Sequence, residues 1–478
     1  MKLSELVAGL EFQGDYIDRE VTCVTSDSRK VAPGCVFVCI KGANFDGHTA
    51  AQSALDKGAA AVVCDHHAAD GNELLVKNTR AANAVLCQNF FGNPQKQLKV
   101  VAVTGTNGKT TVTTVIKRCL ENLGYHAGLI GTVCTEIDDI VLPSKYTTPE
   151  PWDLYSLMSR MVRTGCTHVV MEASSQALHQ CRLANLHIDV AVFLNLSQDH
   201  LDYHGTMEEY FKAKKILFSQ AETAVINIDD EKGKELAEEL KIPTITFSSR
   251  SNDADYTAKS IDLRSDGIRY VVSGYDYIDR ISFSMPGRYS VENSMAALCA
   301  LFSLGIDRDK ACGSLCEFKG VRGRCEVLHS GDYTVITDFA HTADALQNFL
   351  SSVKPFARGK VITLFGCAGD RDAGKRPAMA EAVCSYSDLI VFTADNPRTE
   401  DPERTAESVR PVLESSKKTY KIIMNRHKAV LAALDMMAPG DMLLLCGKGH
   451  EDYQVLDGVT VYLDEGRIVR DYFAGKGV

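Results

Sequence analysis

The stretch from Val100 to Thr111 constrains the fold of this 478-residue chain more than any other part of the sequence. An apolar run, Val100-Val101-Ala102-Val103, leads into Thr104-Gly105-Thr106-Asn107-Gly108-Lys109-Thr110-Thr111, and a helix-compatible segment follows to Leu123. A strand, a tight loop and a helix start in this order surround a phosphate group with backbone N–H groups and the positive end of a helix dipole. Lys109 would neutralise the outer phosphates and Thr110 would offer a hydroxyl group to Mg²⁺. The expected ligand is a nucleoside triphosphate.

Length and composition bound the remaining possibilities. A chain of 478 residues is too long for one core and suggests about three domains. We place them at residues 1–97, 98–325 and 326–478. The net charge of −10 argues against nucleic acid or an anionic membrane as the main partner. No signal-like N-terminus and no membrane-length apolar run occur in the sequence, so we expect a cytoplasmic protein and, without evidence for association, a monomer.

The sixteen cysteines are spread singly through apolar runs, and no C-x-x-C occurs. In a chain without a secretion signal, this pattern is typical of reduced cysteines that serve as small core residues. A structural zinc site is not expected.

The first part reads as a small α/β unit, with strands predicted over 35–40 and 60–64 and turn-rich polar loops between them. Ser28 and His48 lie in such loops. From the residues alone, ordinary polar loops account for these two positions better than ligand binding does. The segment 93–97 is the predicted linker.

The second part alternates strand-like and helix-like segments, which predicts a mostly parallel, helix-covered sheet. The apolar run His168–Met171 ends in Glu172, and Val190–Leu194 runs into a polar cluster that contains His200. Because parallel strands deliver their carboxyl ends to one edge, these side chains should meet at the phosphate loop and hold metal there.

An amphipathic helix is predicted over 207–218, with Tyr210, Phe211, Leu217 and Phe218 as its core side. Its three adjacent lysines would ordinarily be solvated, and residue chemistry does not single one out.

The third part has four predicted strands, at 334–337, 361–365, 389–393 and 442–445, each followed by a loop dense in charge. In an open α/β sheet these loops build the ligand crevice. They carry both arginine and glutamate, which suits a substrate with carboxylate and ammonium groups.

Ordered motifs along nearly the whole chain now identify a resemblance. They are DSRKVAPG, TGTNGKTT, TTPE, MEASSQAL, HQCR, DHLDYHG, FKAKKILF, MPGRYSVEN, VRGRCE, TDFAHTADAL, GDRDAGKRP, DNPR and GKGHEDYQ. In these motifs the sequence resembles the Mur ligase family, and within it the members that add the third residue of the peptidoglycan stem peptide. The resemblance implies an α/β protein of three domains: a small UDP-binding domain, a P-loop ATP-binding domain and a Rossmann-like domain that binds the amino acid.

The resemblance also implies roles for individual residues. The ATP set is Gly105, Thr106, Asn107, Gly108, Lys109, Thr110, Thr111, Asn293, Arg324 and Asp338. The UDP-substrate set is Ser28, Asp46, Gly47, His48, Thr147, Thr148, Ser174, Gln180 and Arg182. The amino-acid set is Arg371, Asp395, Asn396, Pro397, Arg398, Gly447 and Glu451. Lys109, Glu172, His200 and Lys214 are implied as catalytic, Thr110, Glu172, His200 and Lys214 as Mg²⁺ ligands, and Lys214 as carbamylated.

The implied reaction joins meso-diaminopimelate to UDP-N-acetylmuramoyl-L-alanyl-D-glutamate through an acyl phosphate, with ATP and Mg²⁺. Arg398 carries the choice of amino acid, because the family's diaminopimelate-adding members have arginine at this position. Two alternatives stay open: a Mur ligase that adds L-lysine, and a P-loop ATP switch or motor that makes no amide. Ala368 and Ala343 depart from the family pattern, at positions that bear on loop geometry.

Overall fold

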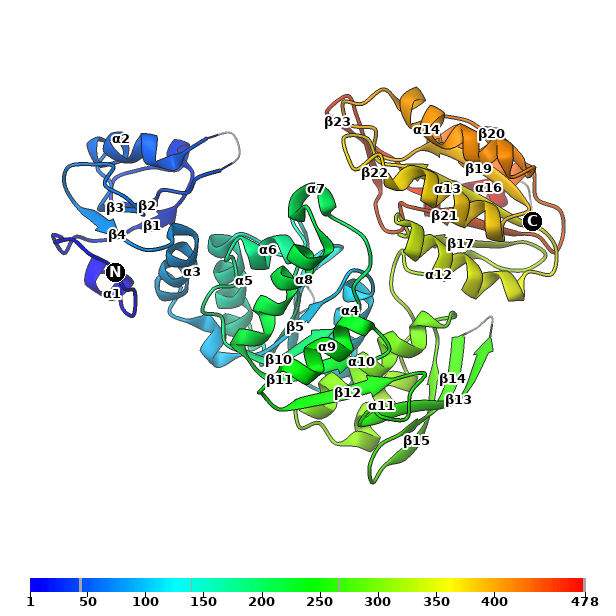
Figure 1. Cartoon of the computed structure of the whole chain (residues 1–478), viewed down its shortest axis with the longest axis horizontal. Coiled ribbons are helices and arrows are strands. Elements are labelled where there is room, and N and C mark those ends of the chain that lie inside the picture. The colour runs from blue at the N-terminus through cyan, green and yellow to red at the C-terminus, as the bar shows by residue number, and fades with distance from the viewer. Residues whose placement is uncertain (43–44, 139, 265–266, 476–478) are drawn as a thin grey trace.

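The computed structural model describes residues 1–42, 45–138, 140–264 and 267–475, and it forms three α/β units in chain order (Figure 1). The main sheets of the units have four, eleven and six strands. The α/β class and the predicted order of units are confirmed. The boundaries at residues 97 and 325 stay predictions.

The N-terminal unit is a small parallel sheet in the order β1-β2-β3-β4. Its α3 packs on this sheet and also contacts α5 of the central unit, where Phe90 and Phe91 surround Trp152. The two units therefore share apolar packing. Ala43 and Asn44, in the predicted loop before Asp46, lie outside the described residues. The elements are α1 (Leu3–Leu6), β1 (Cys23–Thr25), β2 (Cys35–Val38), α2 (Ala51–Asp56), β3 (Ala61–Cys64), β4 (Glu73–Leu75) and α3 (Thr79–Phe90), with short 3-10 turns at Ser28–Lys30, Gly47–Ala50 and Pro94–Gln97.

A disulfide between Cys23 and Cys35 corrects the expectation that every cysteine is reduced. The two residues are direct partners in the β1–β2 register, with their Cα atoms 4.7 Å apart. Twelve residues of sequence separate them, so the pairing follows from strand register and not from a local motif. The other fourteen cysteines are free.

The central sheet has the order β15-β14-β13-β12-β11-β10-β5-β9-β6-β7-β8. Its middle is parallel, and every residue of β9 and β10 is buried, as expected for strands covered on both faces. Alternate residues of β5 serve two cores: Val100 and Ala102 face the side of α5 and α8, and Val101 and Val103 face the side of α4 and α10. The central strands are β5 (Lys99–Thr104), β6 (Ala127–Ile130), β7 (Cys134–Ile137), β8 (Ile140–Pro143), β9 (His168–Glu172), β10 (Ile188–Phe193), β11 (Ala221–Asn227), β12 (Thr244–Ser248), β13 (Tyr256–Arg264), β14 (Gly267–Ser273) and β15 (Ile278–Phe283).

The central helices confirm the predicted strand–loop–helix order and the buried side of the helix after the polar cluster. Tyr210, Phe211, Leu217 and Phe218 are all buried, although regular α-helix ends at Lys215 and a 3-10 turn, Ile216–Gln220, continues it. The antiparallel extensions β6–β7–β8 and β13–β14–β15 were not predicted. The helices are α4 (Lys109–Asn122), α5 (Pro151–Arg163), α6 (Ser175–His179), α7 (Leu201–His204), α8 (Met207–Lys215), α9 (Glu231–Glu239), α10 (Tyr289–Ser303) and α11 (Arg308–Cys316).

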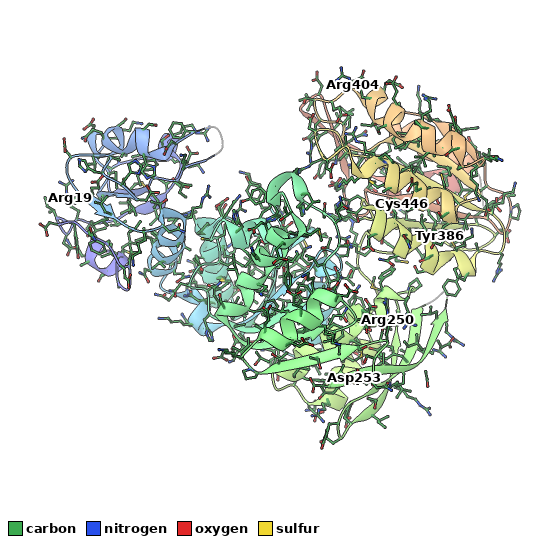
Figure 2. The ribbon with its side chains drawn as sticks, in the orientation of Figure 1. Arg19, Arg250, Asp253, Tyr386, Arg404 and Cys446 are labelled. Atoms are coloured by element: carbon green, nitrogen blue, oxygen red, sulfur yellow. A yellow bond between two sulfur atoms is a disulfide. The ribbon has the colours of Figure 1, made fainter. Side chains whose placement is uncertain are left out.

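The C-terminal unit has the sheet order β16-β17-β21-β18-β19-β20, and all four predicted strands are confirmed. Cys446, labelled in Figure 2, ends β21 inside this unit. Helices α12, α13 and α14 pack against one face, and α15 and α16 pack against the other. The elements are β16 (Glu326–His329), β17 (Thr334–Asp338), α12 (Ala343–Val353), a 3-10 turn (Lys354–Phe356), β18 (Val361–Cys367), α13 (Lys375–Tyr386), β19 (Leu389–Ala394), α14 (Pro402–Ser415), β20 (Thr419–Ile422), α15 (Arg426–Asp435), β21 (Met442–Cys446), the hairpin β22 (Tyr453–Leu456) and β23 (Val459–Tyr462), and α16 (Glu465–Gly475).

Of the helices that the structure describes, none combines the length and the apolar character needed to cross a membrane.

Candidate active site

The loop between β5 and α4 takes a shape that only glycine allows at two positions. Gly105 and Gly108 have φ of 154° and 91°. A Cβ atom on Gly108 would lie 2.5 Å from Asn293 Oδ1, and one on Gly105 would lie 2.9 Å from Leu194 Cβ. Asn195 Oδ1 accepts hydrogen bonds from the amides of Thr106 (3.1 Å) and Asn107 (2.9 Å), which fixes the loop against the end of β10. The predicted phosphate loop is thus held in a single conformation by the neighbouring strand and by α10.

Two lysines converge on this loop. Lys109 Nζ donates to the carbonyl oxygens of Gly105 and Thr106, both at 2.9 Å, and Lys214 Nζ donates to the same Gly105 oxygen at 2.8 Å. Burial lowers the pKa of both lysines, and the charge of Lys109 lowers the pKa of Lys214 further, to well below its ordinary value. The Lys214 amine is therefore poised to be neutral. The lysine that the helix pattern could not single out is the one that faces the phosphate loop.

Glu172, at the end of β9, lies against the first turn of α4. Its Oε1 accepts from Thr110 Oγ1 at 3.0 Å and from the amide of Thr132 at 2.7 Å, and its Oε2 accepts from Thr132 Oγ1 at 3.0 Å. Arg324 Nη2 donates to Thr110 Oγ1 at 3.1 Å. This places a hydroxyl oxygen and a buried carboxylate side by side, which are the hard oxygen donors that Mg²⁺ prefers.

His200 directly precedes α7 as its N-cap residue, in a left-handed conformation with φ of 53°. Burial lowers the pKa of His200, which keeps the ring neutral and able to ligate a metal. Asp199 lies 3.6 Å from His200 Nε2 and 3.9 Å from Lys375 Nζ of the C-terminal unit. Sequence reasoning assigned no role to Asp199, although it adjoins the predicted histidine.

A cavity of about 460 Å³ contains all four predicted catalytic residues, Lys109, Glu172, His200 and Lys214. The UDP-substrate residues Thr147, Thr148, Ser174 and Arg182 also line it. Gln180 does not line this cavity, but it hydrogen-bonds to a residue that does: Gln180 Oε1 accepts from Arg182 Nη2 at 2.8 Å. Glu451 and Tyr453 of the C-terminal unit complete the lining, so the phosphate loop and the predicted amino-acid loop share one cavity.

A second cavity, of about 490 Å³, lies on the other side of the phosphate loop and contains Asn107, Gly108, Thr111, Asn293, Arg324 and Asp338. Arg250, whose guanidinium lies 3.6 Å from Glu292, sits where the central unit faces the C-terminal unit (Figure 2). Asp338 accepts from the amides of Cys325 and Ala340, both at 2.7 Å, and so orders the joint between the two units.

Asp344 of α12 reaches across this second cavity to the phosphate loop. Its Oδ2 accepts from Asn107 Nδ2 at 2.8 Å and from Ser197 Oγ at 3.2 Å. A carboxylate from one unit thus contacts the nucleotide loop of the other.

Three of the predicted amino-acid residues, Asp395, Asn396 and Glu451, surround a lysine that sequence reasoning missed. Lys448 is fully buried, and its Nζ donates to Asn396 Oδ1 at 2.8 Å and to Glu451 Oε2 at 2.7 Å, with Asp395 Oδ1 at 3.6 Å. Asn396 Nδ2 donates to the same Glu451 oxygen at 3.0 Å. The signal in the sequence was a lysine between two glycines, directly after an apolar strand.

The hairpin β22–β23 holds the chain at Arg398. Arg398 has a left-handed backbone with φ of 57°, and its amide donates to Val455 O at 3.0 Å. Gln454, also buried, donates to the carbonyl oxygen of Asp395. Arg371 is exposed, and neither Arg371 nor Arg398 lines the two cavities described above. Pro397 and Gly447 lie in the same loops, after β19 and β21.

The remaining UDP-substrate residues lie apart from the cavities, in the N-terminal unit. Ser28 begins the 3-10 turn after β1. Asp46 caps the turn Gly47–Ala50, and its Oδ1 lies 2.7 Å from His48 Nδ1. The predicted substrate set is thus divided between the N-terminal and the central unit.

Fold and site together define a P-loop enzyme whose phosphate loop shares a cavity with residues of the C-terminal unit. The chain matches the Mur ligase family, catalytic domain, over residues 20–88, the Mur ligase middle domain over 103–301, and the Mur ligase, glutamate ligase domain over 323–449. It belongs to the Mur ligase family.

Individual relatives are similar over the whole chain. A protein of Clostridium tetani, named UDP-N-acetylmuramoyl-L-alanyl-D-glutamate--2,6-diaminopimelate ligase, is 37% identical over 98% of this chain and 99% of its own length. A protein of Listeria monocytogenes with the same name is 39% identical over 97% of each chain. A solved structure with this name has a TM-score of 0.73 and 30% identity, and it covers 100% of this chain and 99% of its own.

Proposed function

We propose that this protein is an ATP-dependent ligase that joins meso-diaminopimelate to UDP-N-acetylmuramoyl-L-alanyl-D-glutamate, a step of peptidoglycan synthesis. The observation that carries the proposal is the single cavity in which Lys109, Glu172 and Glu451 meet. Similarity to relatives with this name, over nearly the full length of both chains, supports the choice of substrates.

Amide formation needs an activated carboxyl group, because a carboxylate does not react with an amine at neutral pH. The γ-phosphoryl group of ATP passes to the D-glutamyl carboxylate, the neutral amine attacks the resulting acyl phosphate, and phosphate leaves. Lys109, on the phosphate loop, stabilises the phosphoryl group during transfer. Arg182 would hold the peptide end of the substrate beside the phosphoryl group. Its side chain is 13% exposed, and its Nη1 donates to Thr148 O at 2.9 Å. Catalysis thus depends mainly on positioning and charge neutralisation.

Bound Mg²⁺ would neutralise the phosphate oxygens of ATP. The residues present fit this ion: Thr110 and Glu172 offer oxygen atoms 3.0 Å apart, and neutral His200 lies in the same cavity. An unmodified Lys214 does not fit as a ligand, because an ammonium group repels a cation.

Carbamylation of Lys214 removes this conflict. The neutral amine adds to CO₂, a nitrogen–carbon bond forms, and one proton is lost, so that the side chain ends in a carbamate. Burial and the nearby charge of Lys109, which keep the pKa of Lys214 low, favour the neutral amine that this reaction requires. The product would offer Mg²⁺ an anionic oxygen ligand in the cavity that also contains His200.

The first experiment measures ADP release with and without UDP-N-acetylmuramoyl-L-alanyl-D-glutamate and diaminopimelate. We expect ADP release to require both substrates. Hydrolysis that ignores the UDP-linked substrate would instead indicate a P-loop switch. We further propose that the enzyme works in the cytoplasm as a monomer with small-molecule substrates, and gel filtration with light scattering tests the monomer.

A further inference from the structure

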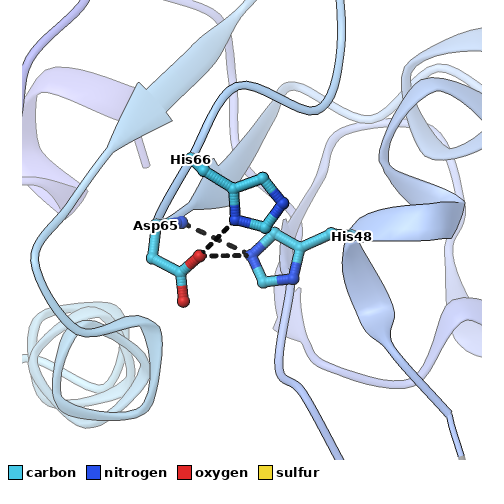
Figure 3. A group of neighbouring side chains, drawn as sticks. All are labelled: His48, Asp65 and His66. Atoms are coloured by element: carbon cyan, nitrogen blue, oxygen red, sulfur yellow. Dashed lines mark hydrogen bonds and ion pairs between the residues drawn. The ribbon is translucent and has the colours of Figure 1, made fainter.

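Three side chains in the N-terminal unit converge at the carboxyl ends of β2 and β3. His48 follows β2, and Asp65 and His66 follow β3 directly (Figure 3). Asp65 Oδ1 lies 3.2 Å from His48 Nε2 and 2.6 Å from His66 Nδ1. Two imidazole nitrogens therefore approach one carboxylate oxygen.

Asp46 orients the buried ring. Its Oδ1 lies 2.7 Å from His48 Nδ1. A ring that donates Nδ1–H to this carboxylate presents Nε2 as its acceptor atom toward Asp65, whose backbone amide donates to Nε2 at 3.4 Å. A carboxylate that holds the outer nitrogen of a histidine in this way is the usual support of a metal-ligating histidine.

The two rings are stacked, with centroids 4.3 Å apart and planes at 27°. The ligand atoms of these two rings and of Asp65 all lie within 4.8 Å of one another. The side chain of His48 is only 5% exposed, whereas those of His66 and Asp65 are 62% and 41% exposed. An ion could therefore enter from solvent and meet one rigid and two adjustable ligands.

We propose that His48 Nε2, Asp65 and His66 bind a divalent transition-metal ion of the zinc or cobalt type, with Asp46 as the positioning residue of His48. Two nitrogen ligands and one carboxylate suit such ions and not Mg²⁺, which prefers oxygen ligands only. Three protein ligands leave a coordination position for water or a ligand. This site is separate from the phosphate-loop cavity, and the proposal does not depend on the ligase reaction.

Calorimetric titration of the full chain with Co²⁺ or Zn²⁺, at saturating Mg²⁺ and ADP to occupy the phosphate-loop sites, tests the proposal. We expect one ion per chain and, for Co²⁺, a visible absorption band from nitrogen ligation. His66→Ala and Asp65→Asn should each weaken binding at least about tenfold, and Asp46→Asn should weaken it about as much. His67→Ala is the matched control, since His67 is the next residue, is 70% exposed and pairs with Glu73 outside the cluster.

His66 and Asp65 are partly exposed, so replacing them should not destabilise the fold. We therefore expect His66→Ala and Asp65→Asn to bind the metal more weakly while the melting temperature of the metal-free protein stays that of the wild type. Equal affinities of His66→Ala, Asp65→Asn and the wild type would overturn the proposal. The proposal would also be overturned if the chain does not bind Co²⁺ and NMR shows a doubly protonated His48 ring at neutral pH. The cluster would then be an imidazolium ion between the carboxylates of Asp46 and Asp65.

Discussion

Lys109 and Lys214 donate to one and the same carbonyl oxygen, that of Gly105, at 2.9 and 2.8 Å. Lys109 comes from the phosphate loop and Lys214 from α8, more than a hundred residues later. Two buried ammonium groups on one oxygen would repel each other, and burial lowers the pKa of both lysines. Lys214, 1% exposed, is the one whose pKa falls well below the ordinary value.

Lys214→Ala should abolish most ligase activity, and added short carboxylates should restore part of it by replacing the carbamate. Lys212→Ala is the control on the same helix, because Lys212 is 58% exposed and pairs with Glu209. Activity and a ¹³C NMR signal from labelled CO₂ are the measurements. Near-wild-type turnover of Lys214→Ala would contradict the role given to Lys214.

Lys448→Met should raise the KM for diaminopimelate much more than the KM for ATP. The change leaves Glu451 and Asn396 without their buried ammonium partner, and loss of one member of a buried ion pair typically costs about 3 kcal/mol or more of stability. Steady-state kinetics with each substrate varied separately measures the KM for diaminopimelate and the KM for ATP. The control is Lys421→Met, at an exposed lysine of β20. Equal rises in all KM values would point to a general loss of structure. In Lys448→Met/Glu451→Gln, which removes the unpaired charge, part of the stability should return.

Arg398→Ala should reduce the preference for diaminopimelate over lysine. We expect Arg398 to bind the second carboxylate of diaminopimelate, and lost hydrogen bonds to a charged group cost roughly 2–3 kcal/mol, or about 30- to 150-fold in kcat/KM. The left-handed backbone at Arg398, held by Val455, supports this role because strained conformations concentrate at ligand sites. Parallel assays with the two amino acids measure the preference, with Arg404→Ala, on the exposed side of α14 (Figure 2), as control. Comparable kcat/KM values for both amino acids in the wild type would contradict the proposal that the enzyme prefers diaminopimelate.

The free energy of unfolding should fall as the pH drops from about 6.5 to about 4, in part because of His204. Burial first, and then nearby His179 and His200, lower the pKa of His204 from its ordinary value of 6.5 to about 4. Between these values the unfolded chain takes up a proton and the folded chain does not, so stability is present above pH 6.5 and is lost toward pH 4. Urea unfolding at several pH values should show a shallower decline for His204→Gln. An identical slope for variant and wild type would show that His204 does not contribute.

Much of this architecture follows from local sequence. β5, β9 and β10 are continuous apolar runs because they are buried on both faces, and such runs are visible without any structure. The polar residues that follow them meet because parallel strands end at one edge. The antiparallel strand β13 was missed because its second half is largely exposed and carries little apolar signal.

Features that depend on tertiary register were not predictable. The Cys23–Cys35 bond requires knowing that β1 lies beside β2 in one register. Lys448 was passed over because a lysine is ordinarily exposed, and only the converging Asn396 and Glu451 make its burial favourable. The roles of the site residues stay predictions, although the structure brings most of them into two adjoining cavities.

The contact of Asp344 with Asn107 places a negative charge of the C-terminal unit at the side chain of a phosphate-loop residue. A carboxylate and the phosphates of ATP repel each other, so we expect bound ATP to weaken this contact. If ATP binding requires the contact to open, the apparent affinity for ATP equals the intrinsic affinity reduced by the cost of opening it.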